Sequence, residues 1–130
     1  MKKYFAILLL FSLSFELSAQ TQKNDDLIIS KVETLPEVKA YIKKYSNYYA
    51  NHPMKGNPRP AIIIGDRPTK QLRFYWVKVG ISDDYLFTTA MHFYVDPKTY
   101  VIKYYDPVLD SAFSLQTWRK KRAEVFQPLR

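Results

Sequence analysis

The sequence predicts an α+β fold: an N-terminal amphipathic helix packed on a four-stranded antiparallel sheet, followed by a short C-terminal helix. Residues 72–106 alternate in character with a period of two, are dense in aromatic and β-branched side chains, and are interrupted twice by turn sequences. Residues 35–49 instead repeat apolar side chains at helical spacing. With 130 residues, the chain is long enough for a single domain with one modest core.

Composition narrows the chemistry that the chain can perform. Its 20 basic and 12 acidic side chains give a net charge of +8 at pH 7, which favours anionic partners at long range. The absence of cysteine excludes disulfides, thiolate metal sites and thiol catalysis. His52 and His92 are the remaining soft metal ligands, and His52 has no second ligand at a suitable spacing. We therefore predict no metal site and no cofactor.

The first 20 residues have the three parts of a secretory signal peptide. Two lysines at residues 2–3 precede an apolar run at residues 4–15 that is too short to span a bilayer, and residues 18–20 offer small side chains for cleavage. The alternative is a buried N-terminal helix, which the leading lysines disfavour. We expect cleavage after Ala19 or Gln20 and a mature protein that is periplasmic or secreted.

Residues 21–33 are predicted to be a flexible mature N-terminus and lead-in, because residues 20–26 are polar and lack periodicity. The folded domain is predicted to span residues 34–130. Thr34 is expected to cap its first helix by accepting a hydrogen bond from the amide of Glu37, whose carboxylate reaches back. The inner face of this helix is predicted to consist of Leu35, Val38, Ile42, Tyr45 and Tyr49. The helix is expected to end near Tyr49.

A loop and a short strand connect this helix to the long strands. Residues 51–59 contain two prolines, a glycine and two asparagines, which is typical of a loop, so His52 is interpreted as a solvated side chain. Residues 61–64 form an apolar run suited to a buried or edge strand. Residues 65–68 turn the chain and lack the glycine spacing of a phosphate-binding loop.

The long strands divide their side chains between two faces. The face toward the helix is predicted to hold Tyr75, Val77, Val79, Ile81, Phe87, Thr89, Met91, Phe93, Val95, Ile102 and Tyr104. The opposite face, called here the aromatic sheet face, is predicted to hold Phe74, Trp76, Lys78, His92, Tyr94, Lys103 and Tyr105.

The aromatic sheet face is the candidate ligand-binding site. Aromatic rings that carry one polar atom give a large contact area at low entropic cost, and neighbouring lysines suit an anionic ligand or a peptide carboxylate. The alternative is that a second layer covers this face, either the C-terminal helix or a partner subunit. On either reading, a lone His92 on such a strand is interpreted as a structural histidine with its hydrogen bonds satisfied, and a catalytic role is the alternative.

The second turn of the sheet resembles a known family. The sequence VDPKT at residues 95–99, followed by β-branched residues, is similar to the hairpin of PepSY-type domains, although Tyr100 stands where a glycine is usual. Asp96 is also expected to accept hydrogen bonds from the turn amides. The likeness extends from the Thr34 helix through this hairpin, an element order shared with cystatin-like domains. It implies a small exported domain that binds or inhibits, often with peptidases as partners, and no catalytic residues.

The C-terminal residues predict a last helix. Residues 106–107 close the sheet, residues 108–113 form a linker, and Ser114 caps a helix over residues 115–126. The basic run at residues 119–122 is interpreted as a solvated helix face. Contact with anionic polysaccharide or lipid headgroups is the alternative after export, and no nucleic-acid partner is expected.

No catalytic arrangement is apparent, and we predict that the protein is not an enzyme. The serines lack an elbow motif with a base and its orienting residue, and the carboxylate pair Asp83-Asp84 lies in a turn. Two classes of function remain. One is a binding or inhibitory module that acts on a peptide-like or anionic ligand, or on an exported peptidase, through an open aromatic sheet face. The other is a structural or oligomeric envelope protein, such as a homodimer, whose sheet face is covered by a partner. Neither class requires a membrane span.

Overall fold

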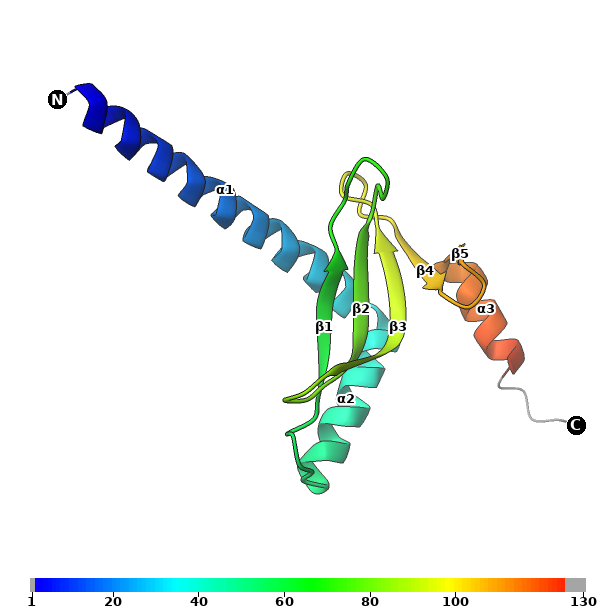
Figure 1. Cartoon of the computed structure of the whole chain (residues 1–130). Helices are drawn as coiled ribbons and strands as arrows, with labels where there is room; N and C mark the ends of the chain where they lie inside the picture. The colour runs from blue at the N-terminus through cyan, green and yellow to red at the C-terminus, as the bar shows by residue number, and fades with distance from the viewer. Residues whose placement is uncertain (1, 126–130) are drawn as a thin grey trace, which may run out of the picture.

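The protein folds as an antiparallel sheet with helices on one of its faces (Figure 1). The structure is a computed structural model that describes residues 2–125, with side chains from residue 17 to residue 124. In chain order the elements are α1 (Lys2–Glu33), α2 (Pro36–Asn51), β1 (Arg59–Asp66), β2 (Tyr75–Ser82), β3 (Phe87–Val95), β4 (Ile102–Asp106), β5 (Ser111–Ser114) and α3 (Leu115–Val125).

The sheet is a meander of five strands in the order β1-β2-β3-β4-β5, each antiparallel to the next. The predicted α+β class and antiparallel sheet are confirmed, but the predicted number of four strands is wrong. The additional strand, β5, lies mostly in the stretch predicted as a linker, where Ala112 pairs with Tyr105 and Phe113 with Tyr104. Its short sequence forms a strand because the outer edge of β4 offers backbone groups that need partners.

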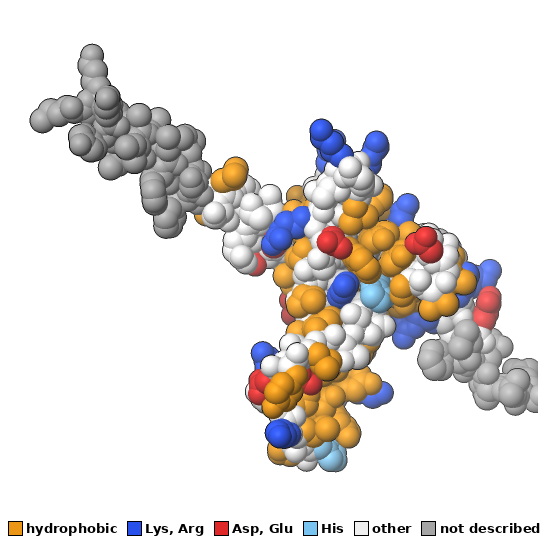
Figure 2. Space-filling view, viewed as in Figure 1, with side chains coloured by type: hydrophobic (Ala, Val, Ile, Leu, Met, Phe, Trp, Pro, Cys, Tyr) orange, Lys and Arg blue, Asp and Glu red, His pale blue; other side chains and the backbone are white. Residues whose placement is uncertain are grey.

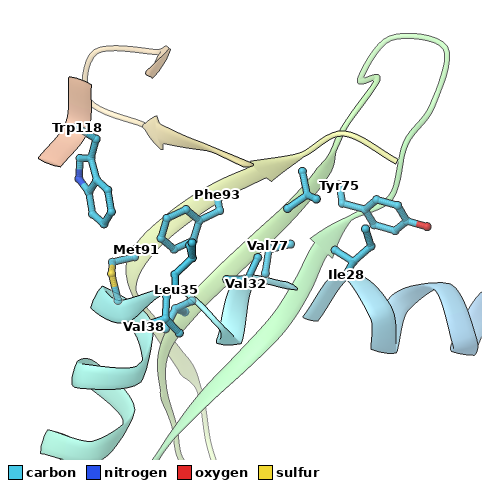
Figure 3. Packing of buried hydrophobic residues seen from close by; sticks show 11 residues of the cluster. Ile28, Val32, Leu35, Val38, Tyr75, Val77, Met91, Phe93 and Trp118 are labelled. Carbon is cyan, nitrogen blue, oxygen red and sulfur yellow. The ribbon is translucent and has the colours of Figure 1, made fainter. Parts of the chain in front are cut away.

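The core lies between the sheet and the helices (Figure 3). Its buried hydrophobic side chains are Ile28, Val32, Leu35, Val38, Tyr75, Val77, Val79, Met91, Phe93, Val95 and Trp118. The ring of Trp118 on α3 meets the edge of Phe93 at 5.6 Å and stacks on Tyr104 at 4.4 Å. All three helices therefore pack on the same face of the sheet, the one that carries Val77 and Phe93.

The helix α1 continues through residues 20–26, for which we expected flexibility. Asp25 is only 5% exposed, and both of its carboxylate oxygens accept hydrogen bonds from the guanidinium of Arg67. Ile28 and Val32, on the same side of the helix, are buried in the core. These tertiary contacts stabilise a helix that the polar sequence alone does not predict, because packing contributes most helical stability in proteins.

Most side chains of the predicted signal peptide, residues 1–20, lie outside the described part of the chain. The signal peptide therefore stays a prediction. Where side chains are described, from Leu17 onwards, those of residues 17–24 are all exposed. Over the described residues, no helix combines the length and the apolar character needed to cross a membrane.

The predicted capping box at the start of α2 is wrong. The hydroxyl of Thr34 donates a hydrogen bond to the carbonyl of Lys31 at 2.7 Å, so Thr34 closes the end of α1. Leu35 occupies the N-cap position of α2 without a side-chain hydrogen bond. The carboxylate of Glu37 does not reach back because Arg119 of α3 donates hydrogen bonds to both of its oxygens. An interaction between helices has replaced the local one.

Two other predicted polar contacts are confirmed. The hydroxyl oxygen of Ser114 accepts a hydrogen bond from the amide of Thr117 at 3.1 Å and caps α3. The carboxylate of Asp96 accepts hydrogen bonds from the amides of Lys98 and Thr99 at 2.8 and 2.9 Å. Both caps depend only on residues within one turn of the chain, which is why the sequence predicts them.

A β-bulge interrupts the pairing of β2 with β3. The register shifts between Val79 and Gly80, which leaves Ala90 without a partner in the ladder. Gly80 approaches β3 so closely that a Cβ atom there would lie 2.0 Å from the carbonyl oxygen of Thr88. The predicted alternation is visible along the whole of β3: Met91, Phe93 and Val95 are buried, and nearer the start of the strand Phe87 and Thr89 are half-buried between exposed neighbours.

Candidate functional site

The structure brings the predicted members of the aromatic sheet face together. Across the ladder, Trp76 lies opposite Tyr94, Lys78 lies opposite His92, and Lys103 lies opposite Tyr94. In Figure 1 these strands lie in front of α2, so Figure 2 looks onto this face and shows hydrophobic, histidine and lysine side chains near its centre.

Its rings form one connected platform. The Trp76 ring lies 5.7 Å from His92, 6.3 Å from Tyr94 and 5.7 Å from Tyr105, measured between centroids. Tyr94 and Tyr105 stack at 4.6 Å, and Phe74 stacks on Tyr94 at 5.8 Å. Offset stacks and edge contacts of this kind are favourable beyond the area that they bury. The platform is therefore held in one arrangement by its own ring contacts.

His92 is tied to Trp76 by a hydrogen bond across the two central strands. The indole Nε1–H donates to Nδ1 of His92 at 3.2 Å. Partial burial lowers the pKa of His92, and the positive charge of Lys78 lowers it further. The imidazole is therefore neutral at pH 7 and serves as an acceptor for Trp76. The hydrogen bond fixes the position of the His92 ring beside Trp76.

Charges of both signs surround the platform. The ammonium of Lys78 lies 4.4 Å from the Trp76 ring centroid, and Lys103 is exposed at the other side. The carboxylate of Asp110 accepts a hydrogen bond from the Tyr105 hydroxyl at 2.8 Å, which raises the pKa of Tyr105 to about 12. The sequence pattern does not place Asp110 in this site, because its contact with Tyr105 arises only when β5 folds back beside β4.

The aromatic sheet face is open. Trp76, His92, Tyr94 and Tyr105 are each only partly buried, and the helices pack on the other face of the sheet. The possibility that the C-terminal helix covers this face is therefore not realised, since Trp118 of α3 belongs to the core.

A concave region that the sequence analysis missed lies on the opposite side of the sheet, between α2 and α3. This interhelical groove has a volume of about 710 Å³, and its lining includes Ala40, Tyr41, Tyr45, Tyr104, Trp118 and Arg122. The helical spacing of the tyrosines on α2 indicates a shared face for them. Their position opposite α3 follows only from the way both helices pack on the sheet.

The described residues contain no group of three or more histidine or acidic side chains that could hold a metal ion. His52 stacks on Tyr48 at 4.5 Å at the end of α2, remote from His92 in the fold. Comparison of the chain with protein-family models, with curated proteins and with solved structures found no match. The resemblance to PepSY-type and cystatin-like domains therefore stays a prediction.

Proposed function

We propose that this protein is an exported, non-enzymatic binding module that holds a peptide-like ligand with a free carboxylate against its aromatic sheet face. The observation that carries the proposal is the connected ring platform around Trp76 and Tyr94, which the helices leave uncovered. Aromatic side chains lose few rotamers on binding, and rings already fixed by stacking lose fewer still. Such a surface binds flat or extended groups at low entropic cost.

The carboxylate of the ligand is assigned to the lysines beside the rings. Lys78 lies over Trp76, and Lys103 lies opposite Tyr94, so an ammonium group is present on each side of the platform. Three acids lie nearby: Asp110, whose carboxylate accepts a hydrogen bond from the Tyr105 hydroxyl, and Asp106 and Asp66, whose charges act on His92 and Tyr94. A net charge of +8 supports the approach of an anion. An exported peptidase that presents an extended C-terminal segment is the protein form of this ligand, in line with the binding or inhibitory role that the resemblance implies.

Capture from a random peptide library with free C-termini, followed by calorimetry on a selected peptide, tests this function. Replacing Trp76 and Tyr94 together by alanine should weaken binding at least about tenfold, since anchoring aromatics dominate interface energies. The same double variant should lower the free energy of unfolding by no more than about 2 kcal/mol, because cross-strand pairs on an open face contribute little each. Tyr85→Ala is the matched control, since Tyr85 is 74% exposed and lies off the platform.

An unchanged affinity in the Trp76/Tyr94 double variant contradicts the assignment of the site. Unfolding of that variant shows that the rings are core residues and contradicts it as well. Equal binding of the peptide and its C-terminal amide rejects the role given to the two lysines while leaving the platform in place.

A structural or oligomeric role is the second candidate, because the same open apolar face suits a second copy of the chain. Sedimentation at micromolar concentration separates the two functions. In a monomer, acrylamide should quench a tryptophan component that Trp76→Phe removes, since Trp118 is only 7% exposed. A dimer in which that component is shielded supports the oligomeric function in place of ligand binding.

A further inference from the structure

The interhelical groove is built from rigid aromatic surfaces. On one side, Tyr41 and Tyr45 of α2 are one helical turn apart with centroids 4.6 Å from each other. On the other, Trp118 of α3 stacks on Tyr104 of β4 at 4.4 Å with an interplanar angle of 6°. The buried side of Trp118 contacts Phe93 in the core, so its ring cannot easily move. The walls are therefore aromatic, and the one formed by Trp118 and Tyr104 is held by its contact with the core.

Two small residues line the groove, one at the bulge in β3 and one on α2. Ala90, the residue that the bulge leaves unpaired, lines the groove together with its neighbour Met91. Ala40 also lines it and is exposed, so α2 presents no side chain beyond Cβ at this point. A volume of about 710 Å³ lies in the range of small-molecule sites.

The charged side chains at the groove leave a positive surplus. The one acid in the lining, Glu37, is bound by the guanidinium of Arg119, and this contact lowers its pKa. Two cations also line the groove and have no carboxylate within ion-pair distance among the described residues: Lys44, and Arg122, which lies 4.8 Å over the Trp118 ring.

The field of Arg122 reaches both walls of the groove. The positive charge of Arg122 adds to the effect of Arg119 in lowering the pKa of Glu37 on α2. Burial raises the pKa of Tyr104 on β4, and the charge of Arg122 partly offsets that rise. A guanidinium offers a planar set of donors that matches a carboxylate. A carboxylate in the groove would therefore meet the guanidinium of Arg122, which forms no ion pair with a described carboxylate of the protein.

We propose that the interhelical groove is a second binding site, separate from the aromatic sheet face, for a small aromatic carboxylate. The ring of the ligand lies between Tyr45 and the Trp118–Tyr104 stack, and its carboxylate faces Arg122 and Lys44. The sheet separates this site from the platform around Trp76, so the proposal does not depend on the function proposed for that face.

Titration with 2-naphthoate, using the neutral naphthalene-2-carboxamide for comparison, tests the proposal on the folded chain. Naphthoate should shift the amide resonances of Ala40 and Ala90 and the indole resonance of Trp118, but not that of Trp76. Replacing both Lys44 and Arg122 by glutamine should weaken naphthoate binding about tenfold, the effect of one lost charge-assisted hydrogen bond, and leave carboxamide binding unchanged. Replacing Lys78 and Lys103 by glutamine should change neither the affinity for naphthoate nor the affinity for the carboxamide.

A pair of alanine variants on α2 separates occupancy of the groove from effects on folding. Ala40→Phe fills the groove and should abolish naphthoate binding. Ala50→Phe places the same ring at an exposed position near the end of the same helix, outside the lining, and should bind as the native chain does. Both variants make the same Ala→Phe substitution at an exposed position of α2.

Four results would overturn the proposal. They are no naphthoate binding up to its solubility limit, equal binding by the Ala40→Phe variant, binding that depends on Trp76 instead, and a stable dimer that shields Trp118 and excludes the probe. Loss of peptide binding at the aromatic sheet face is not among them, so this proposal and the proposed function fail independently.

Discussion

His92 is the residue whose protonation the platform controls most directly. Its Nδ1 accepts a hydrogen bond from the Trp76 indole, and a proton on that nitrogen would remove the acceptor. Partial burial and the charge of Lys78 both lower the pKa of His92 from its ordinary value of 6.5. Because the folded state then binds protons less readily than the unfolded state, the stability that this group contributes decreases as pH falls from 6.5 toward the folded pKa.

A titration of the imidazole resonances of His92 followed by NMR should therefore show a midpoint below 6.5. Lys78→Gln should raise that midpoint by removing a nearby positive charge while keeping a side chain of similar length. Lys103→Gln is the control, since Lys103 is on the same face but does not contribute to the shift. A midpoint that responds equally to both substitutions contradicts the role of Lys78.

Single residues also show where prediction from sequence stops. The caps by Ser114 and Asp96 were predictable because each involves an amide within three residues of the side chain. Thr34 and Glu37 carry the same kind of local signal, yet Arg119 takes the Glu37 carboxylate from a distant part of the chain. Tyr100 has φ of 58°, so the position that resembles a PepSY glycine does require the left-handed backbone region that glycine favours.

At the scale of the element, the bulge in β3 has the widest consequences. It leaves Ala90 facing the interhelical groove, shifts the register between β2 and β3, and depends on a close approach of Gly80 to the neighbouring strand. Glycine inside a strand often marks such an approach. The bulge therefore contributes both to the sheet and to the shape of the proposed second site.

Gly80→Ala should lower the free energy of unfolding by about 3 kcal/mol, because its Cβ would meet the Thr88 carbonyl and the backbone would have to move. Gly65→Ala is the matched control on β1. There the nearest atom is Cε of Lys78 at 2.8 Å, the end of a flexible side chain that can turn away, so we expect a change of less than about 1 kcal/mol. Urea denaturation measures the free energy of unfolding of both variants. Equal losses would show that the close approach of Gly80 to the Thr88 carbonyl does not exclude a larger side chain.

Elements were predictable where their own sequence carries the pattern. The strands β2, β3 and β4 have the aromatic and β-branched alternation of a pleated surface, and α2 and α3 have a helical apolar stripe. The strand β5 and the C-terminal half of α1 lack such a pattern and exist because partners hold them: the edge of β4 for one, Arg67 and the core for the other. The same distinction applies to the sites, since alternation predicts the aromatic sheet face while the interhelical groove needs two helices to be docked.

For the molecule as a whole, the sheet has one face covered by helices and one face left open, and the two proposed sites lie on opposite sides of it. With helices on one face only, the platform stays uncovered, and it is rigid because the core on the other face holds the strands in place. The function proposed here also places the protein outside the cytoplasm. Export would remove the first part of α1, so the mature protein can fold only if the core contacts of this helix lie beyond the cleavage site.

Cleavage after Ala19 or Gln20 would cut α1 in a part whose described side chains are exposed, and the first buried residue among the described side chains of this helix is Asp25. We therefore expect expression in a Gram-negative host to give a periplasmic protein that begins at Gln20 or Thr21, as read by N-terminal sequencing. Its free energy of unfolding in urea should lie within about 0.5 kcal/mol of that of the full chain, because none of the described side chains that cleavage removes is buried.

A shorter form that begins at Ser30 provides the contrast. It lacks Asp25 and Ile28, which exposes a hydrophobic part of the core and leaves Arg67 without its carboxylate, so its stability should fall by about 3 kcal/mol or more. An unprocessed cytoplasmic chain would contradict the predicted signal peptide. Equal stability of the two shortened forms would instead show that α1 between residues 21 and 29 contributes nothing to the fold, and the packing of Ile28 against the sheet would have to be rejected.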